Sequence, residues 1–170
     1  ISWRLRTKGI PPSAASKHDR PMYEFGVEVL PGSLCCGGCG TLKVVPRFLI
    51  FNDTQLVLQV TGNAAKEDFI DLRPGQRAGF HWSENSYKKH ALRVRVARGT
   101  PGLPNGTAWS GEMRPLELVE VPLRLLGSHD IDIALRARVQ RLGTSEVLIL
   151  GVEGATSGPP MYRADNQSRT

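Results

Sequence analysis

Apolar and polar residues alternate one by one along several segments of this chain. Every second residue is apolar from Tyr23 to Val29, from Leu92 to Val96 and from Ile131 to Val139. A period of two puts one set of side chains on a buried face and the other set in solvent, which is the pattern of β-strands. No segment keeps a 3.6-residue period over three turns, so we expect no long helix. The sequence therefore predicts an all-β chain, an antiparallel β-sandwich of eight to ten strands.

Length and composition fit one such unit. The 170 residues are 40% hydrophobic and 22% charged, and the 18 glycines and 12 prolines suit many turns between short strands. This length allows one hydrophobic core with flanking pieces but not two full domains. No apolar run reaches the roughly 20 residues of a membrane-spanning helix. The net charge of +6 permits anionic partners, whether a lipid surface, an acidic peptide or nucleic acid.

One motif occurs twice in the chain. A proline is followed two places on by an aromatic residue, six places on by asparagine and eight places on by a hydroxyl residue, at Pro46–Thr54 and again at Pro160–Ser168. The two asparagines, Asn52 and Asn166, lie 114 residues apart, which is close to the size of one small β domain. We therefore expect one unit of a tandem array. Its expected parts are a leading strand and flexible loop (1–21), one β-sandwich repeat (22–157) and the first strand of the following repeat (158–170).

The repeated asparagine and two tryptophans each admit two interpretations. Asn52 could contact a ligand, but an asparagine after a strand more often hydrogen-bonds nearby backbone groups and fixes a corner. We predict that structural role for Asn52 and for its counterpart Asn166. Trp82 and Trp109 could line a groove for a proline-rich peptide. Tryptophans at strand ends of a sandwich are more often core or rim anchors, and we favour that reading.

The cysteines and the glycosylation sequons point to different compartments. All three cysteines lie between Cys35 and Cys39, so one thiol is always left over, which argues against a disulfide-stapled secreted domain. A structural zinc site needs four ligands, and no second cysteine pair is present, so we predict a glycine-rich loop and no metal. Sequons at Asn52, Asn105 and Asn166 favour an extracellular chain, but such tripeptides often arise by chance. We prefer the intracellular interpretation.

No constellation in the sequence predicts catalysis or a cofactor. Ser128, His129 and Asp130 are adjacent, and adjacent residues on a strand point to alternate faces, so they cannot act together as nucleophile, base and orienter. The most functional-looking group is basic, and it is a candidate anionic-surface patch: Lys88, Lys89, Arg93 and Arg95. The alternative for these residues is a solvated strand face whose charges discourage edge pairing.

Four motifs occur in a characteristic order. They are Val45–Phe48 leading to Asn52, Leu72–Gly75 followed by Phe80–Trp82, Trp109–Gly111, and the restart from Pro159 to Asn166. Together, from Tyr23 to the C-terminus, they resemble the adaptor-binding repeat domain of the vacuolar protein sorting thirteen family. Members of that family are very large, bridge-like lipid-transfer proteins at membrane contact sites. The resemblance implies all-β repeats, each with a characteristic asparagine, here at Asn52 and Asn166.

The resemblance also implies a function. We expect a non-catalytic repeat that docks proline-containing peptides of organelle adaptors and so directs a lipid-transfer protein to membrane contact sites. The implied location is cytoplasmic and peripheral to membranes. Its implied partners are organelle adaptors and neighbouring repeats of the same chain. The basic patch adds an anionic phospholipid surface as a candidate partner, and we expect no nucleic acid. The peptide-binding residues are not predicted. Two alternatives stay open, a purely architectural spacer repeat and an extracellular glycan- or receptor-binding sandwich.

Overall fold

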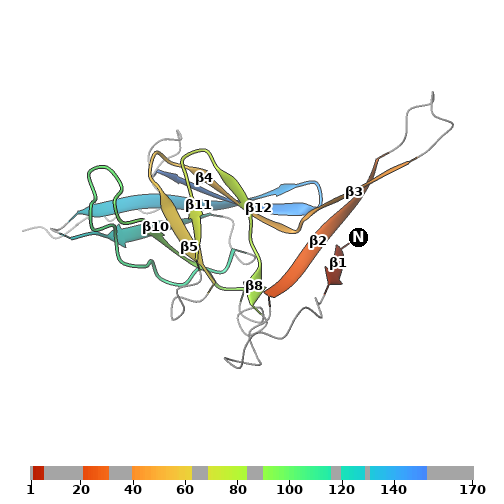
Figure 1. Cartoon of the computed structure of the whole chain (residues 1–170), viewed down its shortest axis with the longest axis horizontal. Coiled ribbons are helices and arrows are strands. Elements are labelled where there is room, and N and C mark those ends of the chain that lie inside the picture. The colour runs from red at the N-terminus through yellow and green to blue at the C-terminus, as the bar shows by residue number, and fades with distance from the viewer. Residues whose placement is uncertain are drawn as a thin grey trace, which may run out of the picture.

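The fold is known from a computed structural model, and the predicted all-β class is confirmed (Figure 1). The described residues contain strands β1 to β12 and no α-helix, and no helix among them is long and apolar enough to cross a membrane. The structure describes residues 2–5, 21–30, 40–62, 69–83, 90–115, 120–128 and 131–152.

The strands form three sheets. The first contains, in spatial order, β1 (Ser2–Leu5), β2 (Pro21–Leu30) and β3 (Thr41–Pro46), with β8 (Trp82–Ser83) also paired to β2. The second contains, in order, β10 (Glu120–Leu126), β11 (Asp132–Leu142), β12 (Ser145–Val152), β4 (Phe48–Asp53) and β7 (Arg77–Gly79). The third contains β6 (Ile70–Leu72), β5 (Leu58–Thr61) and β9 (Arg93–Val96).

The second and third sheets pack on each other and enclose the core. Buried side chains from both sheets belong to one hydrophobic cluster, with Ile50 and Leu150 from one sheet and Val60 and Val94 from the other. In β9 burial alternates along the strand, as the period of two predicts. The sandwich expected from the sequence is therefore present.

One central strand pair differs from the expected antiparallel arrangement. β12 and β4 run parallel, in register from Glu146 beside Phe48 to Gly151 beside Asp53. A parallel pair needs a long crossover connection, and here all the chain between the two strands supplies it. The other described strand pairs are antiparallel, so the five-stranded sheet is mixed.

The apolar-rich segment from Thr41 to Asp53 is divided between two strands. It breaks at Arg47, so that β3 belongs to the first sheet and β4 to the second. Arg47 holds this corner. Its backbone N–H donates to the Glu24 carbonyl oxygen at 2.9 Å, and its guanidinium donates to Glu146 Oε1 at 2.6 Å. Because the Arg47 N–H bonds toward β2, the Pro46 nitrogen faces the outer edge of β3, where the missing N–H of proline is tolerated.

Strands β2 and β3 form an arm that projects from one end of the sandwich (Figure 1). We use the word arm for Phe25–Leu30 of β2 together with Thr41–Pro46 of β3. The arm touches the turn between β11 and β12, where the Thr144 backbone N–H donates to Glu28 Oε1 at 3.2 Å. This bond, together with Lys43, lowers the pKa of the Glu28 carboxyl.

Candidate functional site

The structure places Asn52 at a fully buried corner after β4. Its Nδ2 donates to the carbonyl oxygens of Leu56 at 2.8 Å and Leu72 at 2.9 Å. Its Oδ1 accepts from the backbone N–H of Thr54 at 3.0 Å and from the Thr54 hydroxyl at 2.7 Å. Both donors and the acceptor are therefore used inside the protein, and a side chain with 0% exposure has no surface for a ligand or a glycan.

The two tryptophans have different surroundings. Trp82 is buried, and its Nε1 donates to the Ala91 carbonyl oxygen at 2.9 Å. Its ring lies edge-on to the Phe48 ring, with 4.7 Å between the ring centres. Trp109 is only half-buried, and the Arg95 guanidinium lies 4.3 Å from its ring centre. Trp82 thus belongs to the core, and Trp109 is a surface anchor on the rim.

The predicted basic patch is only partly described. Arg93 and Arg95 share one face of β9, as expected from its alternation. Arg93 is ion-paired with Glu112 at 3.0 Å, and Arg95 donates to Gln59 Oε1 at 2.7 Å while it lies over the rings of Trp109 and Phe69. These internal partners compete with any lipid headgroup for the same guanidinium groups.

Several predicted features lie outside the described residues. They are Lys88 and Lys89, the Cys35–Cys39 loop, His129 and Asp130, and the second motif with Asn166. Among the residues that the structure does describe, no group of three or more His, Cys, Asp or Glu side chains is placed to hold a metal ion.

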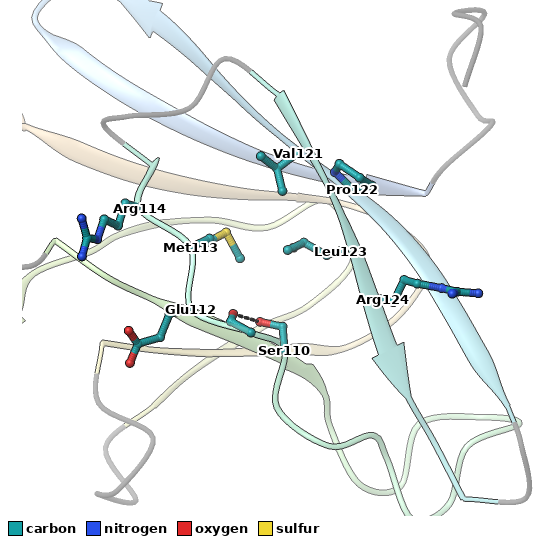
Figure 2. Close-up of a pocket in the computed structure, with 9 residues that line it drawn as sticks. Ser110, Glu112, Met113, Arg114, Val121, Pro122, Leu123 and Arg124 are labelled. Carbon is teal, nitrogen blue, oxygen red and sulfur yellow. Dashed lines mark hydrogen bonds between the residues drawn. The ribbon is translucent and has the colours of Figure 1, made fainter. Parts of the chain in front are cut away.

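A groove opens between the outer edge of β10 and the segment Ser110–Arg114 (Figure 2). Its volume is about 560 Å³. The Met113 and Leu123 side chains point toward each other across it, whereas Arg114 and Arg124 point away (Figure 2). Met113 and Leu123 are 3% and 7% exposed, so the groove has an apolar floor continuous with the core.

One wall of the groove is bound to β9. Backbone N–H groups of Thr107, Ser110 and Met113 donate to β9 and its neighbour Leu92, at Val96, Val94 and Leu92. Successive donors on this wall are therefore three residues apart, whereas their acceptors on the β9 side are two residues apart. A three-residue period is that of a polyproline-II-like chain rather than a strand. Because its inward N–H groups already bond to β9, this wall cannot continue a regular ladder toward β10.

The other wall is β10, which is the edge strand of its sheet among the strands that the structure describes. The Ala108 N–H donates to the Leu126 carbonyl oxygen at 2.8 Å, which shows that the Leu126 backbone faces outward from β10. Residues two apart on a strand direct their backbone groups to the same side, so Arg124 and Pro122 also face the groove. Pro122 lacks an N–H, which an outward position on an edge strand tolerates. The groove thus presents the Arg124 N–H and the carbonyl oxygens of Pro122 and Arg124.

Charged residues at the groove margin have partners of their own. The Arg124 guanidinium pairs with Asp132 at 2.6 Å, and Glu112 holds Arg93. The groove therefore combines the apolar side chains of Met113 and Leu123 with a strand edge to which no further described strand is paired, and ion pairs lie at its margin. That combination suits an extended peptide better than a charged small molecule.

Two sequence features belong to this groove. Pro122 interrupts the apolar stretch from Leu116 to Leu126, and Trp109–Gly111 is one of the four ordered motifs. Neither signal shows that the two stretches face each other, because that depends on β9 and β11 lying beneath them. No family model and no curated protein sequence matches this chain.

Proposed function

We propose that this chain is a non-catalytic interaction module that docks an extended, proline-containing peptide in the groove along β10. The observation that carries the proposal is the open edge of β10 beside an apolar floor. An edge strand with free N–H and C=O groups is the usual template for adding a strand from a partner. The affinity of such a complex comes from main-chain bonds, and its selectivity comes from pockets for alternate side chains.

The backbone groups of β10 define how a peptide would bind. Two peptide N–H groups would donate to the carbonyl oxygens of Pro122 and Arg124, and one peptide carbonyl would accept from the Arg124 N–H. Peptide side chains directed inward would contact Met113 and Leu123. Three main-chain bonds and one apolar anchor describe a modest, transient interaction rather than an obligate one.

Proline in the peptide suits this geometry. A strand added to β10 directs every second N–H toward Ser110–Arg114, where the Ser110 and Met113 N–H groups are already bonded to the β9 side. Peptide residues whose N–H groups point to that side form no strand pairing there. Proline at those positions therefore loses no hydrogen bond. Proline also lowers the entropy of the free peptide and so reduces the cost of ordering it.

The resemblance to the adaptor-binding repeats supports the biological setting of this proposal. In that setting the peptide belongs to an organelle adaptor, and the module is cytoplasmic and directs a lipid-transfer protein to membrane contact sites. Anionic lipid is a weaker candidate ligand, because the described arginines of the basic patch are held by Glu112, Gln59 and Trp109.

A matched pair of variants tests the groove. A random twelve-residue phage-displayed library is selected on the full chain, and an enriched proline-containing peptide is titrated against the parent and two variants. Arg124→Pro removes the outward N–H without removing a bond to β11, and we expect at least about tenfold weaker binding. Arg124→Ala keeps that N–H and should bind within about threefold of the parent, since the side chain points away from the groove.

Two further results decide the outcome. Hydrogen exchange at the Arg124 amide should slow when the peptide is added, which reports the bond even if Arg124→Pro lowers stability. Equal binding by both variants, together with unchanged exchange at Arg124, contradicts the proposed site. If the library yields no peptide, the spacer-repeat alternative is favoured.

A further inference from the structure

The arm has an apolar face and a polar face, and much of its apolar face lies in solvent, whereas the apolar faces of the sandwich sheets are buried. Residues paired across antiparallel strands lie on the same face, and three successive pairs of the arm are entirely apolar. These pairs are Val29 with Leu42, Val27 with Val44, and Phe25 with Pro46. Val29, Leu42 and Val44 are 72%, 65% and 57% exposed, so the outer half of this face is in solvent.

The polar face of the arm contacts the turn between β11 and β12, whereas the apolar face lies against the sandwich at its inner end, where the ring centres of Phe25 and His81 are 6.5 Å apart. Glu28 accepts from the Thr144 N–H, and Lys43 pairs with Glu28 at 3.2 Å on this same face. Gly26 lies against Thr144 so closely that a Cβ there would be 2.6 Å from the Thr144 Cβ. Three apolar side chains gathered in solvent on one face of a sheet indicate that another surface covers them.

The chemistry of the apolar face selects the kind of partner. Its six residues carry no charge and are mostly aliphatic, and they lie on a sheet, which packs best on another sheet about 10 Å away. A membrane-binding surface instead combines apolar residues with Lys or Arg around them. The only described lysine of the arm, Lys43, is on the opposite face and bonded to Glu28.

The sequence indicates where a second sheet of this kind would come from. The motif repeated after 114 residues predicts a like unit in the same chain. The arm joins the start of β4, whereas β12 ends at the opposite end of this parallel strand pair. Like units connected in this way would follow one another head to tail. Linked units meet at effective concentrations of about 1 mM, so a weak interface is sufficient.

We propose that the apolar face of the arm is the docking surface for a second copy of this unit, packed sheet on sheet. This inference is independent of the peptide groove, because β10 and the arm belong to different sheets. Separate copies of the chain should therefore show weak, reversible self-association through Val29, Leu42 and Val44.

Analytical ultracentrifugation of the full chain tests the proposal, from about 10 µM to about 1 mM, the range in which linked units meet. The weight-average mass of the parent should rise with concentration. The double variant Val29→Thr, Leu42→Thr places threonine, a β-branched residue that suits strands, at two exposed positions. Its melting temperature should therefore not fall. Its association should be at least about tenfold weaker. Leu126→Thr is the control, since Leu126 is 63% exposed but lies in β10.

Three outcomes overturn the proposal. The first is a parent that stays monomeric over the whole range, and the second is a double variant that associates as tightly as the parent. The third comes from sedimentation with neutral phosphatidylcholine vesicles. If the parent pellets with the vesicles, the double variant does not, and neither self-associates without lipid, then a membrane covers this face instead of a second copy.

Discussion

β3 and β4 are neighbours in the sequence but have opposite environments. β4 lies between β12 and β7, and its inward residues Phe48, Ile50 and Asn52 are buried. Among the described strands β3 pairs with β2 alone, and Thr41 to Val44 are all exposed. Both strands are rich in apolar residues, so composition does not separate them. The difference is made by how many strands each one pairs with.

The two strands therefore contribute to different properties of the protein. The polar groups of the Asn52 side chain near the end of β4 are satisfied internally, which stabilises the fold but leaves none of them for a partner. The apolar side chains of β3 contribute little to the stability of the isolated unit because they remain in water. Perturbing β4 should affect the whole unit, whereas perturbing the arm should affect only its attachment.

The largest effect is expected from Asn52→Ala. This change leaves the carbonyl oxygens of Leu56 and Leu72 and the Thr54 N–H without their partner in a buried corner. Each such group costs about 1–3 kcal/mol, and we expect the free energy of unfolding to fall by about 3 kcal/mol in total. Urea denaturation measures this change. Thr54→Val removes the hydroxyl that donates to Asn52 Oδ1 and accepts from the Leu56 N–H, and it should cost about 1–2 kcal/mol. Equal losses in both variants would contradict the central role of Asn52.

A smaller and more local effect is expected from Gly26→Ala. The new Cβ would lie 2.6 Å from the Thr144 Cβ and 3.2 Å from the Thr144 carbonyl oxygen, so the arm must move away from the turn. Such overpacking costs about 1–3 kcal/mol. Hydrogen exchange should speed up in β2 and β3 while β4 and β12 keep their protection.

A second substitution at the contact partner serves as the control for Gly26→Ala. Thr144→Gly removes the Cβ that the new methyl group would meet, so the double variant should recover part of the lost protection. If Gly26→Ala instead lowers protection equally in β4 and β12, the arm and the sandwich are one cooperative unit, and the contrast between β3 and β4 fails.

The smallest effect is expected from the protonation of His81. Its ring centre lies 4.4 Å from that of Tyr23 on β2, and burial lowers the pKa of this imidazole. Because the unfolded chain binds the proton more readily, stability is complete above the ordinary pKa of about 6.5 and falls as the pH drops from there through the lowered value. His81→Phe should flatten that part of the pH profile of the melting temperature. A variant that loses stability between pH 7.5 and 5.5 as the parent does would contradict the assignment.

Local pattern predicted the elements of the fold better than their pairing. Alternation in Leu92–Val96 and Asp132–Val139 was enough to find β9 and much of β11 and to assign their buried faces, because that information lies within each strand. The parallel pairing of β4 with β12 was not predictable, since it depends on contacts between residues such as Arg47 and Glu146, which are 99 positions apart. The break at Arg47 has the same origin, because a proline indicates an interruption but not a change of sheet.

The site was less predictable than the fold. The residues that were singled out for function are either satisfied internally, as Arg93 and Arg95 are, or outside the described part of the chain, as Lys88 and Lys89 are. The groove depends on two backbone features, a three-residue period beside β9 and an outward-facing Pro122 on β10. Backbone direction at an edge is decided by which neighbours are present, and single-residue chemistry does not reveal it.

The parallel pair at the centre of the sandwich has a consequence for how the chain folds. β4 cannot gain its β12 partner until almost 100 further residues are available, and closing such a long loop is entropically costly, so this step should be slow and late. During synthesis the edge of β4 that later pairs with β12 stays unpaired while the intervening strands emerge from the ribosome. If a like unit follows in the same chain, its equivalent strand competes for the same edge. Domain swapping between adjacent units is therefore the misfolding route that this topology has to avoid.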